Sequence, residues 1–128
     1  MITDPEIAEL SRTAATYDMF RVQLVALCDQ ALDDWRPLTL TSPLYLQISE
    51  IQGELNTLFY IVDRVACMYP DFDTFIEDNP ATIASGQTRM KRFSQWSAIN
   101  NAMNRIYKSS QRWRNRWFKL MELRGELL

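Results

Sequence analysis

Five basic side chains near the C-terminus have the spacing that points most directly to a binding chemistry. Arginine or lysine recurs there at intervals of three or four positions. On an α-helix, at about 100° per residue, this spacing places all five on one face, in a line about 20 Å long. Such a line can neutralise successive phosphates of a nucleic-acid backbone, and arginine can contact one phosphate through two N–H groups. The predicted polyanion-binding residues are Arg105, Lys108, Arg112, Arg116 and Lys119.

Two other interpretations of this basic line fit the sequence. Residues 1–80 carry 14 acidic and four basic side chains, whereas residues 81–128 carry ten basic and two acidic ones. The line can therefore dock an acidic partner protein, or it can lie along the acidic faces of the chain's own earlier helices. In the last case it is a charged surface without a ligand.

Tryptophans alternate with the basic residues between Arg112 and Phe118. The alternation is typical of proteins that stack the bases of single-stranded nucleic acid, but on a helix the tryptophans point away from the basic face. We therefore expect them in the core or, because the last helix is the longest and should extend beyond the others, in a protein interface. The predicted interface residues are Trp113 and Trp117, with Phe20 and Val25 from the apolar middle of the first helix.

Carboxylates are the only groups from which a catalytic site can be assembled. The chain has no histidine, which excludes a histidine base and every histidine-ligated metal site. Glu50 and Glu54 lie four positions apart, as in helical nucleotide pyrophosphohydrolases that hold Mg²⁺, but such sites need a second acidic pair on a facing helix. We therefore predict no catalytic residues, no metal site and no cofactor. A Mg²⁺-dependent pyrophosphohydrolase is kept as a remote alternative.

The cysteines and the uncharged segments indicate the cellular setting. Cys28 and Cys67 lie in apolar segments without metal-ligand spacing, so we expect two buried, reduced thiols, as in a cytoplasmic protein. The acidic N-terminus lacks the apolar core of a signal peptide. The longest uncharged stretch contains Pro37 and Pro43 and is too short to cross a bilayer. We expect no membrane association.

Three long helices must position these residues. Only three glycines occur, and 47% of the residues are hydrophobic, which favours an all-α domain over a β-sandwich. Thr3–Glu6 forms a capping box, and Ser42-Pro43 and Pro70 mark further helix ends. The predicted helices cover residues 4–35, 43–69 and 88–123, with a short helical plug near 71–78. Residues 1–128 are thus expected to form one domain, an up-down-up bundle of three long antiparallel helices.

Apolar residues recur in each predicted helix at intervals of three and four positions, which predicts the core. The predicted core rows are Ile7, Leu10, Ala14, Tyr17, Leu24, Cys28, Ala31 and Trp35; Leu44, Ile48, Ile51, Leu55, Leu58, Val62, Val65 and Tyr69; and Trp96, Ile99, Met103, Ile106, Trp113, Trp117, Leu120 and Leu127. Arg21 interrupts the first row, so it either reaches solvent or pairs with a carboxylate such as Asp18. Gly53 interrupts the helical pattern of the second segment and suggests a close helix crossing.

Together these features predict a non-enzymatic interaction subunit of a larger complex. Its basic face would bind a polyanion, most simply a nucleic-acid backbone without base specificity. Its tryptophans and the apolar middle of its first helix would contact a protein partner or a second copy. The main alternative is a purely protein-binding helical module, such as an inhibitor, immunity protein or chaperone, with the basic face docking an acidic partner.

Overall fold

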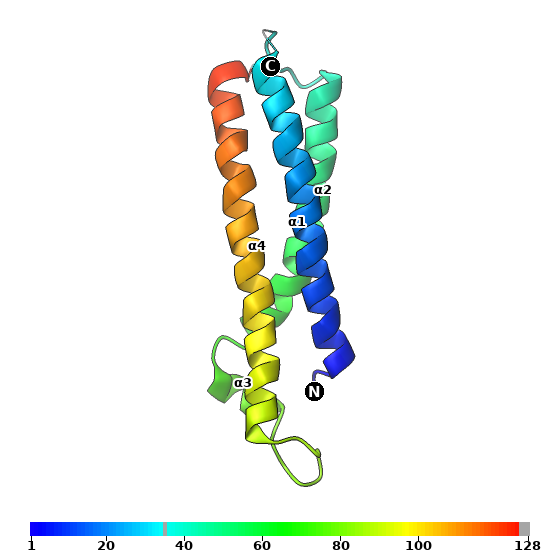
Figure 1. Ribbon diagram of the computed structural model, residues 1–128, viewed down its shortest axis with the longest axis vertical. Helices are drawn as coiled ribbons and strands as arrows, with labels where there is room; N and C mark the ends of the chain where they lie inside the picture. The colour runs from blue at the N-terminus through cyan, green and yellow to red at the C-terminus, as the bar shows by residue number, and fades with distance from the viewer. Residues whose placement is uncertain (35, 126–128) are drawn as a thin grey trace.

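The computed structural model describes residues 1–34 and 36–125. Every secondary-structure element of more than one residue in this part of the chain is an α-helix. The order along the chain is α1 (Asp4–Asp33), α2 (Pro43–Met68), α3 (Phe72–Asp78) and α4 (Arg89–Arg124). The three long helices run up, down and up, with short α3 at the lower end of the bundle (Figure 1). The predicted all-α bundle of three antiparallel helices with a short helical plug is confirmed.

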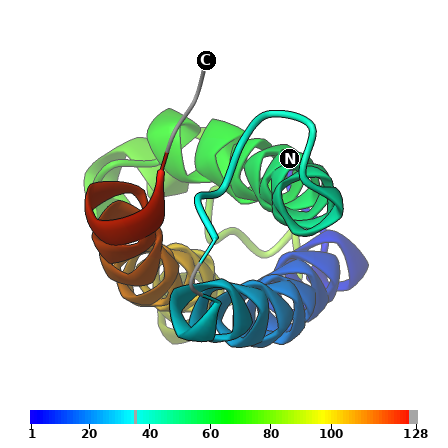
Figure 2. The same cartoon turned by 90° about the horizontal axis from the view of Figure 1, so that it is seen from above.

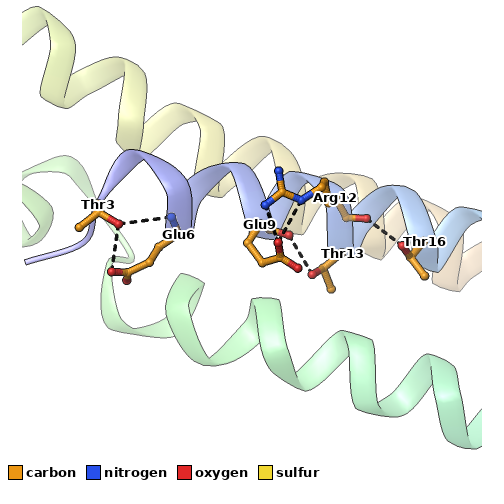
Figure 3. A network of polar contacts seen from close by, with 6 residues as sticks. All are labelled: Thr3, Glu6, Glu9, Arg12, Thr13 and Thr16. Atoms are coloured by element: carbon orange, nitrogen blue, oxygen red, sulfur yellow. Dashed lines mark hydrogen bonds and ion pairs between the residues drawn. The ribbon is translucent and has the colours of Figure 1, made fainter.

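Helices α1, α3 and α4 begin where the sequence supplies a side-chain cap, whereas α2 begins at Ser42-Pro43 without a side-chain cap hydrogen bond. The Thr3 hydroxyl accepts a hydrogen bond from the Glu6 amide, which is one half of the predicted capping box, and it donates to the Glu6 carboxylate, which in a full capping box would accept from the Thr3 amide (Figure 3). Asp71 and Thr88 cap α3 and α4, each by accepting a hydrogen bond from the amide three residues further on.

Polar side chains of the first half of α1 are satisfied within the helix itself. The hydroxyls of Thr13 and Thr16 donate to the carbonyl oxygens four residues earlier, and Arg12 pairs with Glu9 (Figure 3). Thr13 is buried, and its hydroxyl has a partner in the Glu9 carbonyl, 2.9 Å away. A polar residue can therefore lie in the packed part of α1 without an unsatisfied donor.

The predicted apolar rows form the core. α1 packs along both α2 and α4, whereas α2 runs obliquely and contacts α4 less extensively (Figures 1 and 2). Each row member within the described residues is buried or partly buried, and Trp35 and Leu127 lie outside those residues. The row members with the most complete burial are Tyr17, Leu24, Cys28, Ile48, Leu55, Val62, Ile99, Ile106 and Leu120.

Helix α3 closes the lower end of the bundle. Phe75 is fully buried, and its ring lies edge-on to Tyr69 with 5.1 Å between the centroids. The indole Nε1 of Trp96 donates to the Tyr69 carbonyl over 3.0 Å. Buried Asn79 accepts a hydrogen bond from the Ile2 amide at 2.8 Å, which fixes the N-terminus to the end of α3.

The expectation that the C-terminal third of the last helix extends beyond the other two is wrong. The Leu38 amide donates to the Arg124 carbonyl at 2.7 Å, and the Arg124 guanidinium donates to the Leu32 carbonyl at 3.3 Å. The end of α4 is therefore held beside the end of α1 and the connector to α2. The extra length of α4 lies at its other end, next to α3 (Figure 1).

Cys67 is exposed, which corrects the expectation of two buried thiols, whereas Cys28 is fully buried. Burial raises the pKa of the Cys28 thiol to about 12. The Cys67 thiol lies 3.5 Å from the Asp63 carboxylate, and this hydrogen bond raises its pKa as well.

Ellman's reagent at pH 8 should therefore modify one thiol of the native protein and two thiols of the unfolded protein. Asp63→Asn should accelerate the native reaction, because it removes the carboxylate that disfavours the Cys67 thiolate. Cys67→Ser should abolish the native reaction. Rapid modification of both thiols in the native protein would contradict the burial of Cys28.

Gly53 does not lie at a close helix crossing, which corrects the expectation from the sequence. It is exposed, and no neighbouring side chain or other helix lies within 4 Å of the place where its Cβ would be. Its backbone is helical without a positive φ, unlike Gly86, which has a φ of 67°. Gly53 therefore costs α2 backbone entropy without a packing gain.

We predict that Gly53→Ala raises the free energy of unfolding by about 0.5–1 kcal/mol. The measurement is urea denaturation followed by circular dichroism at 222 nm. Gly86→Ala is the matched control, and it should lower the free energy because alanine disfavours a positive φ. Destabilisation by Gly53→Ala would show that this face of α2 is packed in solution.

Candidate functional site

The five predicted polyanion-binding residues lie on one exposed face of α4, which continues as a helix through Ser109 and Ser110. Two of the five are paired with carboxylates of α1. Arg105 donates through Nε to Asp18, and Arg116 Nε lies 3.6 Å from Asp29. The alternative in which α1 neutralises the basic line is therefore correct for these two residues.

The other three basic residues keep their charge uncompensated. Lys108, Arg112 and Lys119 are exposed and form no ion pair with any residue that the structure describes. Exposed ion pairs such as those of Arg105 and Arg116 contribute little to stability and exchange readily with another anion. Two residues of the basic line are thus paired with α1, and the other three are available to an external anion.

Helix α1 contributes a sixth basic side chain, which lies at the boundary between α1 and α4 beside the basic line. Asp18 is paired with Arg105, so the expected ion pair between Arg21 and Asp18 is not formed. Instead, Arg21 Nε donates to the hydroxyl of Ser109 at 3.1 Å. This contact with a small buried residue of α4 holds the guanidinium at the boundary between the two helices.

These cations line a groove between α1 and α4. Its volume is about 440 Å³, and four of its six lining side chains are basic. The lining residues are Arg21, Val25, Arg112, Asn115, Arg116 and Lys119. Among residues 1–34 and 36–125, Asp29 is the one carboxylate paired with a lining residue, so these residues give the groove a local excess of three positive charges. A concave site with one sign of charge concentrates oppositely charged ligands.

Arg21 is the functional candidate that the spacing of the basic line missed. It belongs to another helix, and only the packing of α1 against α4 brings it to Arg112 and Arg116. The available signal was its position inside an apolar row, where a charged side chain needs a reason to be retained.

The predicted interface residues have different environments. Trp113 is 7% exposed, and its indole Nε1 donates to the Tyr17 hydroxyl at 2.8 Å. It therefore belongs to the chain's own core, because the C-terminal end of α4 does not extend beyond α1. Trp117 is partly buried and packs on the Tyr45 ring with 6.0 Å between centroids. Neither tryptophan shares a surface with the basic line.

The two remaining interface candidates, Phe20 and Val25, are partly buried and line separate grooves. Val25 belongs to the basic groove described above. Phe20 lies in a groove between α1 and α2, where Glu50 and Glu54 also lie.

No carboxylate cluster suited to a metal ion is present among the described residues. Glu50 and Glu54 are exposed on α2, and within residues 1–34 and 36–125 no three Cys, Asp or Glu side chains come together in a group that could hold a metal ion. The described residues thus bring no second acidic pair to Glu50 and Glu54, as a pyrophosphohydrolase site would need. No helix in the described segments is sufficiently long and apolar to span a membrane.

Comparisons with protein-family models, with curated proteins and with solved structures find no match to this chain. The chemistry of the α1–α4 groove therefore has to be inferred from its own residues.

Proposed function

We propose that this chain is a non-enzymatic interaction subunit that binds a polyanion, most simply a nucleic-acid backbone, in the groove between α1 and α4. The observation that carries the proposal is the meeting of Arg21, Arg112, Arg116 and Lys119 in one groove whose cations are only partly neutralised. Arginine dominates the set, and its planar guanidinium suits the oxygens of a phosphate.

The length of the free cationic line favours a repeating polymer over a compact ligand. Lys108 and Lys119 are eleven residues apart on one helix, which corresponds to about 16 Å. A nucleic-acid strand carries one phosphate per about 3.4 Å of helix axis, so this length faces about five phosphates. A backbone of that kind can satisfy the whole line without shape-specific contacts.

Absence of an aromatic platform supports backbone binding without base readout. The side chains that line the groove include no Phe, Tyr or Trp, and stacking on such rings supplies much of the affinity for single-stranded bases. Of the two tryptophans next to lining residues along α4, Trp113 is in the core and Trp117 packs on the Tyr45 ring. Contacts to phosphates position a nucleic acid but do not read its sequence.

Replacement of two unpaired cations tests the proposal. Arg112→Gln/Lys119→Gln should weaken binding of a fluorescein-labelled 20-base-pair DNA duplex by more than about tenfold at 50 mM salt, because charge-assisted hydrogen bonds are lost. The slope of log K against log salt should fall by about 2, one unit for each lost phosphate contact. Both quantities are measured by fluorescence anisotropy.

Arg64→Gln/Lys91→Gln is the matched control, because it removes the same charge from exposed positions outside the groove. Its affinity and salt slope should stay close to those of the unmodified chain. Equal losses in both variants would show that binding reflects overall charge and not the groove. Tighter binding of poly-glutamate than of the duplex would favour the alternative, an acidic partner protein.

A further inference from the structure

A second and larger groove lies on the other side of α1, between α1 and α2. Its volume is about 760 Å³, and it is open to solvent along its length. The residues that line it are Phe20, Gln23, Ala26, Leu27 and Gln30 from α1, and Gln47, Glu50, Ile51 and Glu54 from α2.

The floor and the rim of this groove differ in chemistry. Phe20, Leu27 and Ile51 are partly buried and pack against the core with one side, so the other side forms an apolar floor. Glutamine amides line the rim on both helices. The only charged lining residues are Glu50 and Glu54, and neither forms an ion pair within the described part of the chain.

The dimensions of the groove suit a helix. The α1 lining extends from Phe20 to Gln30, which is about 15 Å at 1.5 Å per residue, or nearly three helical turns. Glu50 and Glu54 are four residues apart on one side of α2, so their carboxylates are one turn apart. A partner helix with apolar residues on one stripe and Lys or Arg at the edge of that stripe would satisfy both the floor and the two carboxylates.

We propose that the α1–α2 groove is the docking site for a cationic amphipathic helix of a partner protein. Charge complementarity selects this occupant. An anionic helix would meet Glu50 and Glu54 with like charge, and a neutral one would leave the two carboxylates beside an apolar contact without compensation. The site lies on the opposite side of α1 from the basic groove and does not depend on the polyanion proposal.

The two sites together describe an adaptor. α1 contributes Arg21 and Val25 to one groove and Phe20 and Leu27 to the other. One rigid helix therefore separates a surface that attracts anions from a surface that attracts cations, and both ligands can be bound at the same time.

A synthetic helical peptide tests the docking site. The probe is a labelled 14-residue peptide with leucines at positions i, i+3, i+4 and i+7 and lysines elsewhere, titrated against the full chain by fluorescence anisotropy. Ala26→Arg places a bulky cation at the exposed rim of the groove and should weaken peptide binding at least tenfold. A peptide with glutamate in place of lysine should not bind measurably.

Ala8→Arg is the matched control for Ala26→Arg. Ala8 is also an exposed alanine on α1, and the two positions are 18 residues apart, so they lie on the same helix face at a distance of about 27 Å. This variant has the same added charge and should bind the peptide as the unmodified chain does. Arg112→Gln/Lys119→Gln should also leave peptide affinity unchanged, which separates this proposal from the polyanion proposal.

Equal peptide affinity of the Ala26→Arg and Ala8→Arg variants would overturn the assignment of the groove. Equal binding of the leucine–glutamate peptide would overturn the cationic occupant. Sedimentation velocity adds a third outcome: if the chain alone is a dimer that Ala26→Arg dissociates, a second copy covers the groove and the proposed partner helix is wrong.

Discussion

Helix α1 has to pack against α2 and α4 at the same time, and the arrangement of the core and of the two grooves depends on this constraint. Its buried row lies on a narrow strip that faces the bundle centre, and α2 and α4 pack on either side of it. Leu24 and Cys28 are fully buried, so each contributes nearly the largest transfer free energy that its side chain can give, about 1.5–3 kcal/mol for leucine. The positions that flank the strip are left to form the walls of the two grooves.

The seam with α4 shows how charge is arranged around an apolar contact. Inside it, Trp113 donates to Tyr17 and Arg21 donates to Ser109, so these buried or partly buried donors have partners. Outside it, Asp18 and Asp29 of α1 face basic residues of α4. These carboxylates are fewer than the cations they face. The seam is consequently held by its buried and partly buried contacts, and its exposed edge retains a surplus of positive charge.

The helices and the core follow from local patterns in the sequence, which is why they could be predicted. Spacing by three and four, the capping box at Thr3 and the prolines at helix starts depend on neighbouring residues only. Whether Trp113 lies in the core or in an interface could not be decided in this way, whereas the exposure of Cys67 could have been: five positions after Val62 and two before Tyr69, it lies on the face of α2 opposite the buried row. Whether the C-terminal end of α4 overhangs α1 depends on the contacts of Leu38 and Arg124, which lie far apart in the sequence.

The candidate site likewise has one part that could be predicted from the sequence and another that could not. The basic face of α4 is a property of one helix and could be recognised from its periodicity, including Arg112 and Lys119. The pairing of Arg105 and Arg116 with α1, and the arrival of Arg21 in the same groove, are properties of two helices in a particular rotation. The sequence left open whether α1 neutralises the basic line. In the structure, carboxylates of α1 pair with two of the five basic residues, Arg105 and Arg116.

Asp29 is the residue through which the surplus of positive charge can be tested most directly. Its carboxylate lies 3.6 Å from Arg116 Nε and competes with any external anion for that guanidinium. If the groove binds a polyanion, Asp29→Asn should increase affinity for inorganic polyphosphate about three- to tenfold, measured by isothermal titration calorimetry at 50 mM salt. Asp73→Asn, the same change on α3, should have a much smaller effect. Unchanged or weaker binding by Asp29→Asn would contradict the central claim.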